Sequence, residues 1–181
     1  MFRVSLGEYE VVCQADGLPL IHDRYEREAK LAERFDDAGP DAQSTCFCAV
    51  SRRGEAWPYL TITQRYSPDF TVCFYPGLLI VPETQVLFIG AGRRLLAYDL
   101  SAPSRLWEDE ADTGFWFWSR YGRFVLMAAE LELAAWDVNG RKLWSRFVEP
   151  PWTYQVEGSS VVVKVEGWQI TRVSLAEEQP T

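Results

Sequence analysis

The sequence predicts a mainly β fold, in which antiparallel meanders form an open propeller-like array or a sandwich and one helix lies near the N-terminus. The strongest observation is a segment that occurs about two and a half times, with a period of about 37 residues. Asp99 and Trp107 in one copy correspond to Asp137 and Trp144 in the next, and a third, decayed copy covers residues 161–175. Short apolar segments also alternate with turn residues, which is typical of antiparallel strands joined by short connections.

The first element expected along the chain is a β-hairpin. Glu8–Gln14 alternates weakly between polar and apolar residues, as a strand with one buried face does. Asp16-Gly17 is a strong signal for a tight hairpin turn, because both residue types tolerate the left-handed backbone conformation. Leu18–Ile21 is therefore the expected return strand.

A helix is expected next, over residues 22–38. This segment is rich in Glu, Arg, Lys and Ala, and its apolar residues fall on one helical face. Gly39 and Pro40 supply the expected stop signal, so that residues 1–42 form a hairpin and helix cap. The residues on the apolar face are Tyr25, Ala29, Ala32 and Phe35.

Residues 43–181 are predicted to form repeated β meanders. Each later repeat contains an apolar strand, an alternating strand that ends in Asp, a tight turn, a strand with Leu-Trp, and an aromatic strand. The first strand of each repeat is apolar at every position, which is typical of strands buried on both faces and indicates stacked sheets. The strands expected before and at the start of the repeats are Cys46–Ser51, Trp57–Gln64, Phe70–Tyr75, Leu78–Val81 and Val86–Ile89.

This order of elements resembles the blade of quinoprotein-type (PQQ-like) β-propeller repeats. The resemblance covers about residues 78–175 and is carried by two Ala-x-Asp strands, a Gly-containing turn and a terminal Trp in each unit. It implies that Trp107 and Trp144 dock neighbouring blades, so both are expected to be largely buried. No set of cofactor or calcium ligands carries over, so neither a cofactor nor a metal is expected. The matching segments are Ala97-Tyr98-Asp99, Ala135-Trp136-Asp137 and Asn139-Gly140-Arg141.

The length of the chain argues against a closed ring. Propellers have at least four four-stranded blades, and 181 residues leave too few once the N-terminal segment is set aside. We therefore expect a single domain, residues 1–181, in which the meanders form an open array capped by residues 1–42. A homo-oligomer is a further expectation, because association of copies would complete the array.

Composition and charge restrict the classes of partner. Hydrophobic residues make up 48% of the chain and charged residues 24%, as in ordinary globular proteins. The net charge is −8, and more than half of the excess lies in residues 1–42. Because an acidic chain repels nucleic acid and anionic membranes, neither is an expected partner. The sequence has no apolar run long enough for a signal peptide or a membrane span, so a cytoplasmic location is expected.

The cysteines and the single histidine are interpreted as structural residues. Cys13, Cys46, Cys48 and Cys73 lack metal or redox spacing, and Cys46 and Cys48 share one face of a strand. Reduced, buried thiols are therefore expected. His22 is a possible general base, but a surface or helix-capping role is favoured. Because there is no second histidine and no nucleophile motif, the protein is not expected to be an enzyme.

The densest acidic run is the first candidate binding surface. Glu108, Asp109, Glu110 and Asp112 are predicted to lie on a solvated hairpin loop. The run lacks the spacing of a strong calcium loop, which leaves calcium as the weaker interpretation. As an acidic knob it would attract a basic partner.

Aromatic residues form the second candidate surface, with Trp116, Trp118 and Trp152 as the candidate binding residues. If the strand alternates regularly, Phe115 and Phe117 face one side while Trp116 and Trp118 face the other. One side then belongs to the core, and the other is either a stacking platform or a second packing surface between sheets. The full set comprises Trp57, Phe115, Trp116, Phe117, Trp118, Trp152 and Tyr154.

Two functional hypotheses follow from these features. The first is a non-enzymatic protein-binding module that engages a basic partner, as an immunity protein or an assembly component does. The second is a carbohydrate- or small-ligand-binding β domain that uses the Trp-rich face. A flat acidic and aromatic patch would favour the first hypothesis, whereas a groove floored by Trp would favour the second.

Overall fold

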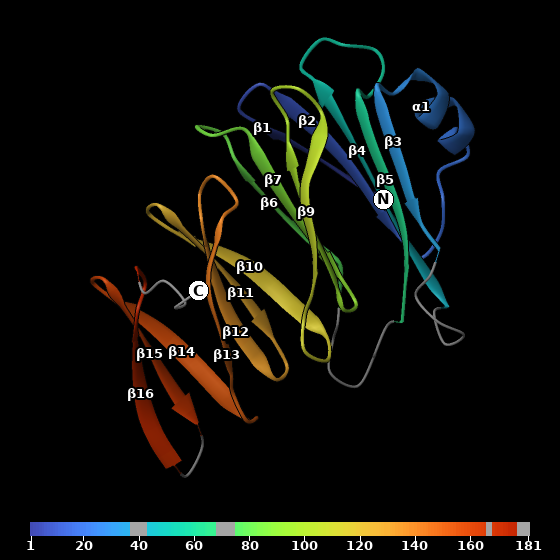
Figure 1. The fold of residues 1–181 in the computed structure, drawn as a ribbon. Helices are drawn as coiled ribbons and strands as arrows, with labels where there is room; N and C mark the ends of the chain where they lie inside the picture. The colour runs from blue at the N-terminus through green and yellow to red at the C-terminus, as the bar shows by residue number, and fades with distance from the viewer. Residues whose placement is uncertain (37–42, 68–74, 166–167, 177–181) are drawn as a thin grey trace.

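The computed structural model describes residues 1–36, 43–67, 75–165 and 168–176, and in them the chain forms four stacked β-sheets and one helix, α1 (His22–Glu28) (Figure 1). Three sheets are simple antiparallel meanders, and the mainly β prediction is confirmed. The sheets fan out as an open array and do not close into a ring (Figure 1). No helix in the described ranges is long and apolar enough to cross a bilayer.

The four sheets, here named A to D in chain order, contain the following strands. Sheet A has the order β1 (Phe2–Leu6), β2 (Tyr9–Ala15), β4 (Ser44–Arg52), β5 (Leu60–Tyr66), β3 (Leu31–Phe35). Sheet B contains β6 (Gly77–Val81), β7 (Val86–Ala91), β8 (Arg94–Asp99) and β9 (Ser104–Glu110). Sheet C contains β10 (Phe115–Tyr121), β11 (Phe124–Ala129), β12 (Glu132–Asp137) and β13 (Lys142–Phe147). Sheet D contains β14 (Trp152–Glu157), β15 (Ser160–Val165) and β16 (Trp168–Ser174).

The hydrophobic core is divided into three layers, one in each gap between successive sheets. The second strand of each repeat packs against other sheets on both of its faces. In sheet B this strand is β7, and all six of its residues are buried. In β11 the odd residues Val125 and Met127 face sheet B while Leu126 and Ala128 face sheet D. Burial on both faces is the reason for the continuous apolar runs in the sequence.

The two repeated tryptophans dock neighbouring sheets, but to different depths. Trp144 is fully buried between sheets C and D, as expected. Trp107 is half-buried; it stacks on Trp136 of sheet C with ring centroids 5.5 Å apart. The indole Nε1 of Trp107 donates a hydrogen bond of 2.5 Å to the carbonyl of Gly140, in the turn between β12 and β13. Each contact therefore ties a last strand to the next sheet.

The predicted helix over residues 22–38 is wrong beyond its first two turns. Helix α1 ends at Glu28, because Ala29 adopts an extended conformation. Leu31–Phe35 instead forms β3, which pairs in parallel with β5. Leu31 and Phe35 then pack against the core between sheets A and B, with Ala32 and Arg34 on the exposed side. A period of two thus fits this segment better than the helical period.

The N-terminal hairpin uses a different partner strand from the predicted one. Leu18–Ile21 does not form a return strand, and the side chain of Leu20 is fully exposed. β2 instead pairs with β1, which begins at Phe2. The expected strand over Trp57–Gln64 begins only at Leu60. The expected strand Phe70–Tyr75 lies almost entirely outside the described residues.

The outer faces of the first and last sheets differ. On the outer face of sheet A, Tyr25 of α1 stacks on Phe47 with centroids 5.9 Å apart, and the two residues share a small cluster with Val12 and Ala49. On the outer face of sheet D, the polar side chains of residues 153, 155, 157, 164 and 172 are exposed, whereas Val162 on the same face is buried.

The depth of Trp144 leads to the first testable prediction. Trp144→Ala is expected to lower the free energy of unfolding by about 3–5 kcal/mol, the range for truncating a large buried aromatic residue. Phe147→Ala on the same strand is the matched control, because Phe147 is 68% exposed and should change stability by no more than about 0.5 kcal/mol. Urea unfolding measures both, and equal midpoints for the two variants would contradict the docking role of Trp144.

Candidate binding surface

The aromatic strand β10 does not alternate regularly, and this decides which rings reach the surface. A β-bulge lies at Trp116, since Phe115 pairs with Ala129 and Phe117 with Ala128. The extra residue puts Phe115 and Trp118 together in the layer facing sheet B. The prediction that Phe115 shares a side with Phe117, and Trp116 with Trp118, is therefore wrong, because a bulge shifts the pattern by one residue.

The three predicted tryptophans pack between sheets. Trp118 is 9% exposed, and its ring lies 5.3 Å from Phe88 and 5.4 Å from Trp136. Trp116 is half-buried and stacks on Trp152 of sheet D at 5.4 Å. Trp152 is anchored by a 2.8 Å hydrogen bond from its Nε1 to the carbonyl of Glu130. These indoles thus serve mainly as packing surfaces between sheets, which was the alternative interpretation of the set.

A different group of rings is accessible, and we name Phe117, Tyr121 and Tyr154 the aromatic trio. Phe117 is 46% exposed and Tyr121 is 37% exposed. Phe117 stacks on Tyr154 at 6.3 Å, and Tyr121 meets Tyr154 edge-on at 6.4 Å. The hydroxyl groups of Tyr154 and Ser119 are hydrogen-bonded at 2.6 Å. Burial raises the pKa of Tyr154 to about 12, so this hydroxyl stays neutral at physiological pH.

The trio lies on a continuous edge of the array, formed by the first strands of the four sheets. Three contacts show that these strands are neighbours. Residues of β1 and β6 line the same cavity, and a Cβ atom added at Gly77 of β6 would contact the ring of Phe115 on β10. The trio then joins β10 to β14. We call this edge, made of β1, β6, β10 and β14, the first-strand edge. On β1, Phe2 is 53% exposed. Exposed aromatic residues therefore recur along this edge. Nothing in the local sequence pattern distinguishes Tyr121 from a core residue, so the sequence does not predict that it lies on a surface.

The acidic run lies on a strand and not on the predicted hairpin loop. Residues 104–110 form β9, the last strand of sheet B, so the loop prediction is wrong for Glu108, Asp109 and Glu110. Three of the carboxylates are paired within the chain. The ion pairs join Glu108 with Arg94 at 2.9 Å and Arg105 at 2.6 Å, Asp109 with Lys142 at 2.6 Å, and Glu110 with Arg93 at 3.3 Å.

Asp112 lies just beyond the end of β9 and completes the predicted acidic site. Its side chain is exposed, while its backbone N–H donates to the buried carboxylate of Glu132 at 2.9 Å. The acidic residues are thus not a bare anionic knob. Their ion pairs link neighbouring strands, and in the case of Asp109 and Lys142 neighbouring sheets. Exposed pairs of this kind each contribute little to stability, up to about 1 kcal/mol.

His22 is buried, contrary to the surface role favoured from the sequence. It is only 4% exposed, and its ring packs edge-on against Phe47 at 5.2 Å. Its Nε2 lies 3.0 Å from the hydroxyl of Thr63. Glu26 is also near the ring, but Arg34 donates to both of its oxygens, at 2.7 and 2.5 Å.

The carboxylate of Asp23 completes a group of three metal-capable side chains with His22 and Glu26. The donor set does not fit a cation well, because Arg34 already neutralises Glu26 and lies 3.5 Å from Nδ1 of His22. A metal ion would have to displace a bidentate guanidinium. The residues around His22 therefore form a polar clasp that fixes α1 on sheet A.

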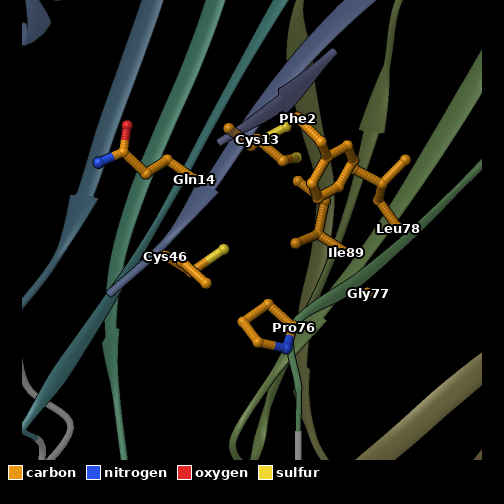
Figure 2. A pocket seen from close by; sticks show the side chains of 10 residues that line it. Phe2, Cys13, Gln14, Cys46, Pro76, Gly77, Leu78 and Ile89 are labelled. Atoms are coloured by element: carbon orange, nitrogen blue, oxygen red, sulfur yellow. The ribbon is translucent and has the colours of Figure 1, made fainter. Parts of the chain in front are cut away.

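Three cysteines line a small cavity between sheets A and B, with a volume of about 30 Å³ (Figure 2). Cys13, Cys46 and Cys48 are free and buried, and Cys46 and Cys48 share one face of β4 as predicted. Burial raises the pKa of Cys46, and contact with Cys13 together with burial raises that of Cys48. The thiols of Cys46 and Cys48 are therefore protonated at neutral pH, which makes them poor nucleophiles. Cys73 lies outside the described residues.

No protein-family model matches the sequence, and no curated protein matches it. The fold is similar to solved β-propeller structures. BamB from Moraxella catarrhalis is 12% identical over 95% of this chain and 48% of that chain, with a TM-score of 0.47. The computationally designed Ika4 protein is 16% identical over 57% of this chain and 67% of that one, with a TM-score of 0.43.

Hsv2 from Kluyveromyces lactis is 10% identical over 55% of this chain and 32% of that chain, with a TM-score of 0.32. The chain spans about half the length of BamB and a third of Hsv2. Sheets B and C of this chain are themselves four-stranded antiparallel meanders.

The clasp around His22 gives the second prediction. His22→Ala is expected to destabilise the protein by about 1–3 kcal/mol, because it removes buried packing and leaves the hydroxyl of Thr63 without its partner. Asp23→Ala is the matched control, since the side chain of Asp23 is 94% exposed. Thermal unfolding followed by circular dichroism compares the two variants, and a His22→Ala protein as stable as Asp23→Ala would contradict the clasp.

Proposed function

We propose that the protein is a non-enzymatic protein-binding module that engages its partner through the first-strand edge. The observation that carries this proposal is the exposed aromatic trio. Its rings are held in place by one another and by the Tyr154–Ser119 hydrogen bond, so little side-chain freedom would be lost on binding. Rigid, partly exposed Tyr and Phe side chains are common anchors at protein interfaces.

The charge of the chain supports a basic partner. The net charge of −8 favours approach of a cationic surface, and the partner could be a toxin held by an immunity protein or a component of a larger assembly. Because Glu108, Asp109 and Glu110 are already paired within the chain, we expect them to attract the partner at long range more than to contact it directly. We also propose that the repeats are quinoprotein-type blades, on the basis of their two Ala-x-Asp strands.

Carbohydrate binding is the second candidate, and the exposed ring of Phe117 favours it. A sugar ring can stack on such a surface. Trp118 and Trp152 are buried between sheets, so their rings are not accessible for stacking on a sugar. A protein partner is therefore preferred, and a glycan is an outcome that the experiment below must separate.

The third prediction tests the trio. Phe117→Ala combined with Tyr121→Ala is expected to weaken binding of the native partner at least tenfold, because interface aromatic anchors contribute more than about 1.4 kcal/mol each when truncated. The partner is first isolated from native lysate by a photo-crosslinking residue placed at Tyr121, and dissociation constants are then measured with the purified protein.

The matched control is Leu106→Ala combined with Phe147→Ala, since these residues are 43% and 68% exposed on the last strands β9 and β13. It should leave binding unchanged. Equal losses for the two double variants, with both proteins folded, would contradict a specific first-strand surface. Saccharide binding that is lost only in the Phe117/Tyr121 variant would establish the carbohydrate alternative.

A fourth prediction concerns charge. If the partner is basic, the association rate should fall as salt is raised from 50 to 300 mM, because exposed charges are screened beyond a Debye length of about 10 Å at 0.1 M. Neutralising Glu108, Asp109, Glu110 and Asp112 together should lower the on-rate more than it raises the off-rate. Stopped-flow association at several salt concentrations measures this, and an on-rate independent of salt would rule out a basic partner.

A further inference from the structure

Two thiols face each other across neighbouring strands of sheet A. Cys13 on β2 is the register partner of Cys48 on β4, and both side chains lie in the core layer between sheets A and B. Side chains of directly paired residues in an antiparallel sheet lie close together. The thiols of Cys13 and Cys48 are hydrogen-bonded to each other. The fold thus brings together two sulfur atoms that are far apart in the sequence, which the spacing of the cysteines does not reveal.

The paired thiols border the cavity between sheets A and B. Its volume of about 30 Å³ is enough for a single ion. Figure 2 shows the sulfur of Cys46 directed toward this cavity and the amide of Gln14 directed away from it. The other described residues that line it are apolar, namely Phe2, Ala15, Pro76, Gly77, Leu78 and Ile89. The cavity therefore offers sulfur ligands within apolar walls.

This set of donor atoms favours a soft metal ion. Thiolates are soft ligands that suit Cu(I), whereas Mg²⁺ and Ca²⁺ require oxygen ligands. Zinc takes four ligands in structural sites. The sulfur atoms of Cys13, Cys46 and Cys48 do not all lie within 4.8 Å of one another, so the three cysteines do not form a compact cluster. An ion that is stable with two sulfur ligands, as Cu(I) is, therefore fits the pair better than zinc.

We propose that Cys13 and Cys48 bind a single soft metal ion of the Cu(I) class in this cavity. Each thiol releases its proton to solvent as its bond to copper forms, and the metal remains Cu(I) throughout. Metal binding to cysteine displaces the thiol proton in this way, even where burial raises the pKa of the group, as it does for Cys48. Cys46 lines the cavity without ligating the ion.

The cavity lies close to the molecular surface at β1. The side chain of Phe2 lines it and is 53% exposed, so this ring separates the thiols from solvent. Movement of one side chain at the start of the chain would admit an ion. Because no residue of the aromatic trio lines the cavity, the inference goes beyond the proposed function and does not depend on it.

A competition titration tests the site. The parent protein carries Cys73→Ser, because Cys73 lies outside the described residues and would add a further thiol. Cu(I) is supplied without oxygen from its complex with the coloured chelator bicinchoninate, and one ion per chain should bind. Cys13→Ala and Cys48→Ala should each weaken binding about a hundredfold, the upper end of the loss for groups that only support a metal ligand. Zn²⁺ should not compete.

The matched control is Cys46→Ala, which removes a thiol from the same strand and the same cavity and should leave the affinity nearly unchanged. Thermal unfolding shows whether the native state binds the ion, because a ligand of the native state raises the midpoint. Cu(I) should raise the midpoint of the parent and of Cys46→Ala, and not that of Cys13→Ala or Cys48→Ala.

X-ray absorption of the Cu(I)-loaded parent counts the ligands without any substitution at the site, so the test holds even if an alanine variant fails to fold. Two sulfur ligands are expected. The proposal is overturned if nitrogen or oxygen ligates the copper, if Cu(I) lowers the unfolding midpoint of the parent, or if Cys46→Ala loses as much affinity as Cys13→Ala. Failure of the parent to take Cu(I) from the chelator would overturn it as well.

Discussion

The stacking of aromatic residues between successive sheets is the contact on which the rest of this structure depends. A three- or four-stranded sheet with apolar side chains on both faces is not stable alone in water, because each face must be covered by another element. Trp107 on Trp136 covers the gap between sheets B and C, and Trp116 on Trp152 covers the gap between sheets C and D. The hydrogen bonds from Trp107 to Gly140 and from Trp152 to Glu130 then fix how far each sheet slides on the next.

Among the residues that the structure describes, this construction leaves strand edges as the main candidate surfaces for binding. The inner faces are filled by the core, α1 covers the outer face of sheet A, and the outer face of sheet D has several exposed polar side chains. The first-strand edge has exposed aromatic rings, while the opposite edge has the ion pairs of β9.

The repeat explains why much of the fold was predictable and where prediction ended. The period, the apolar second strands and the Gly-containing turn are local features, and they correctly placed β6, β7, β11 and β12. Leu31–Phe35 was misassigned as helix because its alternation is short and its partner, β5, lies about 30 residues further on. Likewise, nothing local marks the bulge at Trp116, which is visible only in the pairing of β10 with β11.

The same bulge shows why the candidate site could be predicted only in part. The sequence correctly indicated that residues 115–118 matter, yet exposure depends on a one-residue shift that exchanges the faces of neighbouring rings. Without the bulge, Phe117 would follow Phe115 toward sheet B, and the ring of Tyr154 would lose its stacking partner. The bulge bends β10 so that Trp116 still reaches Trp152 while Phe117 remains exposed. A single irregular residue thus links the packing between sheets C and D to the surface that we propose binds a partner.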